Sequence, residues 1–157
     1  MRHRALLRAG PFVIVAFLAF ASAVGFAAAS GTRTMSLKAA LNAKQEVPPQ
    51  TFKVTRASGV FTATLVKRTK GYRLFWKLTF KKLSGKARSD YIHKGSPGKH
   101  GAAYFHLCSP CSSGVHGTAY ASPAEMTLLK RGLMYVNVRT ARNPAGEIRG
   151  QIRAAAG

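Results

Sequence analysis

The chain has 157 residues, of which 25 are Lys or Arg and 4 are Asp or Glu, giving a formal net charge of +21. Such a charge predicts attraction to polyanions and salt-sensitive association, but it carries no information about the fold. With so few acids, the composition also argues against hydrolytic enzymes that work with a pair of poised carboxylates.

The first 29 residues have the pattern of a signal peptide. Arg2, Arg4 and Arg8 form a cationic start, residues 10–29 carry no charge, and small alanines precede Ser30. This predicts cleavage near residue 30 and export of the remainder. Alternatively, about twenty apolar residues are long enough to be kept as a membrane anchor. We expect no membrane span after cleavage, and a secreted or cell-envelope location.

Removing that segment leaves about 127 residues, a normal size for one domain, which we place at residues 34–155. It keeps 22 of the 25 cations against 4 carboxylates, a net charge of +18.

Alternation with a period of two dominates this domain. Apolar residues recur at every second position in residues 61–65, 72–80, 134–138 and 148–152, and Gly, Pro, Ser or Asn interrupt the chain between these runs. Such runs are typical of antiparallel strands with one buried and one wet face. Seven or eight short strands predict an all-β fold, a Greek-key β-sandwich or barrel.

One short helix is predicted at residues 122–132. Ser122 is a suitable N-cap, Pro123 suits the first turn, Glu125 completes a capping box, and Gly132 ends the segment.

Two cysteines, Cys108 and Cys111, flank a Ser-Pro pair. In an exported chain, a local disulfide is the default interpretation. It is worth at most about 2 kcal/mol by loop closure, so its role would be to shape a loop. A metal site and a redox centre are the alternatives, although a zinc knuckle needs a second cysteine pair and a thioredoxin-type centre needs a βαβ unit.

A basic stripe is predicted on the outer face of the strand at residues 72–81. Arg73, Lys77 and Lys81 recur at every fourth position, with Phe75 between the first two. Cations with an interleaved aromatic side chain resemble polyanion-binding platforms. Export makes nucleic acid an unexpected natural partner, so we expect an anionic cell-envelope polymer or an extracellular protein. The alternative interpretation is an ordinary solvated strand face.

Four blocks of residues resemble the chordin-type (CHRD) domain of secreted microbial proteins and of the animal growth-factor antagonist chordin. They are residues 45–49, Gly59, residues 90–95, and the terminal pair of segments at 135–140 and 146–151. The resemblance implies an immunoglobulin-like β-sandwich or barrel and a non-catalytic binding or structural role outside the cell. It also implies a polar network at the motif positions, which here are Glu46, Asp90, His93, Asn137, Arg139, Glu147 and Arg149.

Two positions depart from the family pattern, since Tyr91 and Arg139 stand where the family usually has histidine. A pairing of Arg139 with Glu147 on the adjoining strand is one expectation. Glu147 and Arg149 lie two residues apart on one strand, share a face and could anchor the network.

The chain lacks a G-x-S-x-G nucleophile elbow and a Gly-rich phosphate loop, so we expect no catalytic residues and no cofactor. A zinc or copper site is the alternative, with His93, His106 and His116 as candidate ligands near the two cysteines. The preferred interpretation is a monomeric, non-catalytic binding module.

Overall fold

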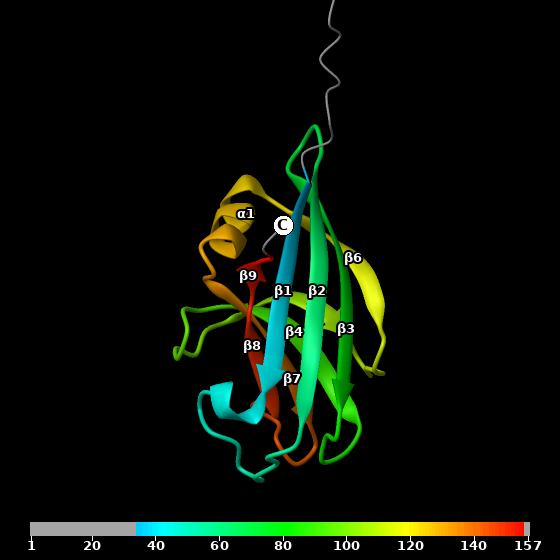
Figure 1. Ribbon diagram of the computed structural model, residues 1–157, viewed down its shortest axis with the longest axis vertical. Coiled ribbons are helices and arrows are strands. Elements are labelled where there is room, and N and C mark those ends of the chain that lie inside the picture. The colour runs from blue at the N-terminus through cyan, green and yellow to red at the C-terminus, as the bar shows by residue number, and fades with distance from the viewer. Residues whose placement is uncertain (1–33, 156–157) are drawn as a thin grey trace, which may run out of the picture. The chain divides into compact units, whose positions relative to one another are not determined.

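The computed structural model describes residues 34–155 and shows an all-β fold, as predicted. Antiparallel strands form a nine-stranded, nearly closed, barrel-like sheet in the order β5-β4-β7-β8-β1-β2-β3-β6, with β9 paired to β1 (Figure 1). The strands are β1 (Thr34–Asn42), β2 (Ser58–Lys67), β3 (Tyr72–Lys81), β4 (Ala87–Lys94), β5 (Ala103–Cys108), β6 (His116–Ala121), β7 (Met134–Thr140), β8 (Ile148–Gln151) and β9 (Arg153–Ala154).

The alternation of the sequence sets the inner and outer faces of the sheet. In β3, Leu74, Trp76 and Leu78 are buried, whereas Phe75 and Lys77 between them are exposed. Leu37, Phe61 and Leu65 of β1 and β2, together with the buried aliphatic residues of β7, complete one continuous core. Burial of these apolar side chains is the main stabilising contribution to such a fold.

The one α-helix among residues 34–155, α1 (Pro123–Lys130), has the predicted cap and lies at the end of the barrel where β1 begins (Figure 1). Ser122 Oγ accepts a hydrogen bond from Glu125 N at 3.2 Å, and Ser122 N donates to Glu125 Oε2 at 2.5 Å. Gly132 follows in the left-handed conformation with φ of 65°. A 3₁₀ turn, η1 (Ala43–Gln45), was not predicted.

The loop between β5 and β6 helps to close the barrel. Cys111 N donates to Ala87 O of β4 at 3.3 Å, and Leu78 N of β3 donates to Val115 O at 2.8 Å. The predicted disulfide between Cys108 and Cys111 lies in this loop. The disulfide therefore shapes a segment that bridges β3 and β4 by main-chain hydrogen bonds, beyond the ends of β6 and β5.

A second, polar layer covers the outer face of β7 and β8. Tyr135, Asn137 and Arg149 alternate with core residues and yet are 1%, 3% and 1% exposed. Residues 43–50 and 95–101 cover them, since Arg149 Nη2 donates to Ser96 O at 3.1 Å and Gly101 N donates to Tyr135 Oη at 3.2 Å. Strands β7 and β8 are thus buried on both faces.

The predicted signal segment, residues 1–29, lies outside the described residues. Within residues 34–155, no helix is long and apolar enough to cross a membrane.

Candidate anion-binding face and buried polar layer

The predicted basic stripe lies on the outer face of β3. Phe75 is 40% exposed, and Lys77 and Lys81 are exposed on either side of Thr79. Arg73 is half-buried: its Nη1 donates to Tyr120 Oη at 3.1 Å, and its guanidinium carbon lies 5.7 Å from the centre of the Phe75 ring. The four residues therefore lie on one face, but the Arg73 guanidinium is already partly engaged by Tyr120 and Phe75.

Strand register places further exposed side chains beside Lys77, on the strands that flank β3. These side chains run across the sheet, perpendicular to the stripe, and the sequence alone does not show this alignment. Lys77 lies opposite Thr62 of β2 and His116 of β6, Thr62 lies opposite Lys38 of β1, and Lys38 lies opposite Arg153 of β9. These five side chains are exposed, and we call them the basic row. With a strand spacing of about 4.8 Å, Lys38 and Lys77 stand about 10 Å apart along the row.

A shallow hollow of about 430 Å³ adjoins the basic row. Thr62, Thr64 and Phe75 line it together with Lys38 and Lys77. Hydroxyl groups and an exposed aromatic ring therefore lie between the cations, which is the composition of a surface that contacts both charged and uncharged parts of a polymer.

Three of the four carboxylates are withdrawn from the surface, and the fourth, Glu125, is half-buried at the start of α1. Glu46, Asp90 and Glu147 are 5%, 0% and 0% exposed, and Glu125 is bound in the helix cap. Among the described residues, Glu125 is therefore the one side-chain carboxylate left near the surface cations.

Glu46 lies in the polar layer beside Asn137. Asn137 Nδ2 donates to Glu46 Oε2 at 3.3 Å, and Glu46 Oε1 and Asn137 Oδ1 are both buried without a partner. Burial raises the pKa of Glu46 to about 8, against the opposing effect of the Arg149 charge and the Asn137 hydrogen bond. A protonated Glu46 supplies a donor where two acceptors would otherwise remain unpaired.

Gly146 permits this contact. A β-carbon at Gly146 would lie 2.4 Å from Glu46 Oε2 and 2.5 Å from Asn137 Nδ2. The glycine is therefore required by close approach of the polar side chains rather than by the turn alone.

His93 occupies a second part of the polar layer. Its ring stacks on Tyr135 with centroids 4.9 Å apart, Nδ1 lies 3.0 Å from Gly101 O, and Nε2 lies 3.5 Å from Arg139 Nη2. Burial lowers the pKa of His93, and the Arg139 charge adds to this effect. Arg139 also lies over the ring of Tyr91 at 5.1 Å. Tyr91 and Arg139 thus pack against each other.

Asp90 lies apart from the polar layer, beside the disulfide. Its Oδ2 is 3.7 Å from Cys108 Sγ, and Oδ1 is buried without a partner. Burial raises the pKa of Asp90 to about 7, opposed by the main chain and charge of Arg139. Asp90, Cys108 and Cys111 place potential metal-ligand atoms within 4.8 Å of one another. Because both sulfurs are joined in the disulfide, the oxidised protein offers the carboxylate alone.

The histidines proposed as alternative ligands lie on three strands. His93 is buried on β4, His106 is exposed on β5 with its ring 5.0 Å from Tyr91, and His116 is exposed on β6 opposite Lys77. Among the described residues, the three do not form a group with metal-ligand spacing.

Glu147 forms its own cluster at the terminal turn. Its carboxylate accepts hydrogen bonds from Ser84 N at 2.6 Å, Thr140 Oγ1 at 2.5 Å and Asn143 Nδ2 at 3.1 Å, as well as from Ser84 Oγ. Burial acts to raise the pKa of Glu147, but these hydrogen bonds outweigh it and hold the pKa below its usual value.

Two of the seven motif residues, Asp90 and Glu147, therefore occupy separate environments, whereas the other five lie in the polar layer. Glu147 is held by Ser84, Thr140 and Asn143, whereas Arg139 lies at His93 on the other side of β7, so the expected Arg139–Glu147 pairing does not form. Five further residues take part in these contacts and were not predicted as site residues: Ser84, Tyr135, Thr140, Asn143 and Gln151. Tyr135 and Thr140 fall within the quoted motif, but Ser84 carries no signal, because it comes close to Glu147 only through tertiary packing.

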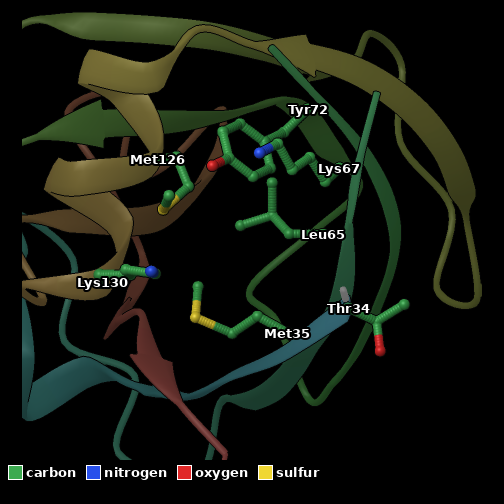
Figure 2. Close-up of a pocket in the computed structure, with 7 residues that line it drawn as sticks. All are labelled: Thr34, Met35, Leu65, Lys67, Tyr72, Met126 and Lys130. Carbon is green, nitrogen blue, oxygen red and sulfur yellow. The ribbon is translucent and has the colours of Figure 1, made fainter. Parts of the chain in front are cut away.

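An apolar pocket of about 400 Å³ lies between α1 and the adjacent ends of β1, β2 and β3. Figure 2 shows Met35, Leu65 and Met126 within it and Lys67 and Lys130 on two sides. This pocket is separate from the basic row and the polar layer.

The CHRD domain family matches residues 37–152, which is most of the chain. No curated protein and no solved structure matches the chain significantly. CHRD domains are non-enzymatic and typically extracellular. The match spans β1 to β8, including the hairpin that carries Asn137, Glu147 and Arg149. The chain belongs to the CHRD domain family.

Proposed function

We propose that this protein is a non-catalytic binding module of the cell envelope or extracellular space that engages an anionic polymer through the basic row and the neighbouring face of β3. The observation that carries the proposal is the segregation of charge. The basic row crosses five strands, while the carboxylates of the described domain lie in the interior or in a helix cap.

The arrangement suits a repeating, flexible polyanion better than a small rigid ligand. Lysine ammonium groups are mobile point charges that adapt to different spacings, and Phe75 and Tyr120 offer exposed rings, 40% and 69% accessible. The surface is open and lacks the enclosure of a catalytic cleft.

Binding of immobilised polygalacturonate, a carboxylated polysaccharide, tests the proposal. Affinity should fall steeply between about 50 and 200 mM NaCl, because association releases condensed counterions. The double variant Lys77→Gln/Lys81→Gln should weaken binding at low salt and reduce the salt dependence. Both side chains are exposed on the outer face of β3, so the fold should be retained.

The matched control is Lys94→Gln/Lys99→Gln, which removes the same charge from exposed positions at the end of β4 and in the loop that follows it. Equal losses in the two double variants would show attraction by net charge alone and contradict a defined face. Binding that is independent of salt would contradict an electrostatic mechanism altogether.

A further inference from the structure

A second basic feature lies outside the basic row, in a pocket between η1, the loop at residues 95–98 and the strands β1, β8 and β9. The pocket has a volume of about 590 Å³, and its lining includes four cations and no acid. The cations are Lys38, Lys44, Arg149 and Arg153. Lys38 and Arg153 also belong to the basic row, whereas Lys44 and Arg149 belong to the pocket alone.

Arg149 is the buried member of this group, with 1% of its surface exposed. Its Nη2 donates to Ser96 O at 3.1 Å and to Gln151 Oε1 at 3.4 Å, and its guanidinium carbon lies 3.5 Å from the centre of the Tyr135 ring. Its Nη1 is buried and has no hydrogen-bond partner. Buried donors are nearly always satisfied, so an orphaned guanidinium nitrogen beside a pocket needs an explanation.

The neighbouring acid does not supply the missing counter-charge. The interaction between Glu46 and Arg149 is a charge interaction without a hydrogen bond. Burial raises the pKa of Glu46 to about 8, which keeps this carboxyl protonated at neutral pH. A buried permanent cation is costly unless it is paired.

The other polar side chains of the lining are already engaged. Gln45 Nε2 donates to Ala40 O at 2.9 Å, and Gln151 Nε2 donates to three main-chain carbonyls, at 2.7, 2.8 and 3.0 Å. The donors that remain for a ligand are therefore those of the cations.

We propose that this pocket binds a sugar-sized organic anion whose carboxylate, sulfate or phosphate group lies beside Arg149 and is held from the rim by Lys44. A guanidinium presents its donors in a planar fork that matches such groups, and the apolar Ala39, Val47 and Pro97 provide uncharged wall for the rest of the molecule. The volume lies within the range of ordinary small-molecule sites. The exposed cations at the rim draw the anion in.

Titration with D-glucuronate, followed by amide NMR shifts, tests this site directly, with D-glucose as the neutral control. Glucuronate should give saturable shifts at Gln45, Gly98 and Gln151, and glucose should give none. Inorganic sulfate should displace glucuronate, because recognition is by charge and hydrogen-bond donors shared among these anions. Non-saturating shifts, equal shifts with glucose, or failure of sulfate to compete would overturn the proposal.

Two variants locate the site. Arg149→Lys keeps the charge but loses the fork, and Lys44→Gln removes one exposed rim cation without touching the buried layer. Each should weaken glucuronate binding by about tenfold, the effect of losing one hydrogen bond to a charged group. Lys86→Gln is the charge-matched control and should bind as the wild type. If Arg149→Lys does not fold, Lys44→Gln decides: an affinity equal to that of the control overturns the proposal.

The pocket and the polymer-binding face share Lys38 and Arg153, but variants at other residues distinguish them. Lys77→Gln/Lys81→Gln alters the face without changing the pocket, and Lys44→Gln alters the pocket without changing the basic row. Failure of either proposal can therefore be recognised separately from failure of the other.

Discussion

Glu46 lies beside Asn137 in the polar layer, shielded from solvent and within the field of Arg149. Its folded pKa is raised from the ordinary value of 4.5 to about 8, so the native state holds this proton more tightly than the unfolded chain does. The stabilising contribution is complete below about pH 4.5 and is lost as the pH rises toward 8. Asp90 follows the same sign, with a pKa raised to about 7.

Glu46→Gln should therefore flatten the pH dependence of stability. The neutral amide replaces a protonated carboxyl, so the free energy of unfolding should change less between pH 5 and pH 8 than it does in the wild type. Urea unfolding of both proteins at several pH values in this range measures the difference. A wild-type slope preserved in the variant would show that Glu46 is ionised in the native state.

Gly146→Ala tests the close approach of Glu46 and Asn137. The added β-carbon would meet polar atoms at 2.4 to 2.6 Å, so the side chains or the hairpin must shift. We expect a loss of about 2 to 3 kcal/mol in the free energy of unfolding, typical of overpacking. Gly85→Ala is the control, because a β-carbon there meets no atom within 4 Å. Equal stability of the two variants would contradict the packing described for the polar layer.

Helix α1 is the element whose local sequence specifies it most completely. Ser122 and Glu125 satisfy each other's main-chain groups, and Gly132 permits the left-handed residue after the helix. The strands differ in this respect. Their residues alternate as expected, but β7 and β8 are also covered on the polar side, where Tyr135 and Arg149 are buried. Alternation of apolar and polar residues predicts the face of a strand that packs on the core. It does not predict that loops cover the polar face as well.

Ser122→Ala should lower the free energy of unfolding by about 1 kcal/mol, the usual cost of losing an N-cap acceptor. Thermal unfolding should show a correspondingly lower midpoint. Ser112→Ala, a change at an exposed loop serine, is the control and should leave the midpoint unchanged. A stability equal to that of the control would mean that the capping box does not contribute to the fold.

In the molecule as a whole, most acidic side chains are buried and most basic side chains lie at the surface. The domain beyond the predicted signal segment carries 22 Lys and Arg, many of them exposed, whereas three of its four acids are buried and two of these have raised pKa values. The protein surface is thus almost purely cationic near neutral pH. Such a surface repels itself, opposes self-association and attracts polyanions.

Screening should therefore stabilise this protein. Raising NaCl from about 20 to 200 mM shortens the Debye length and weakens repulsion among the surface cations, so the thermal midpoint should rise. Differential scanning calorimetry at constant pH measures the effect, and addition of sucrose at fixed low salt provides an uncharged comparison. A midpoint that falls with NaCl would indicate that favourable ion pairs dominate the surface.

Much of the candidate basic face could be predicted from the sequence. Arg73, Phe75, Lys77 and Lys81 share the outer face of β3 because a strand has a strict period of two. Lys38, His116 and Arg153 could not be assigned to the same face, because they come from other strands and their alignment depends on register. Likewise, Arg149 belongs to the quoted motif, but its burial beside a pocket follows from loops more than fifty residues away in the chain.

The sequence by itself determined the all-β class, the capped helix, the local disulfide and the membership of the CHRD family. Each of these depends on short-range patterns: alternation, capping spacing, neighbouring cysteines and contiguous motif residues. The tertiary structure alone decided which cations form a row, which acids lose contact with water, and that Arg139 contacts His93 rather than Glu147. Those outcomes depend on strand register and loop coverage, which are set by packing between residues distant in the chain.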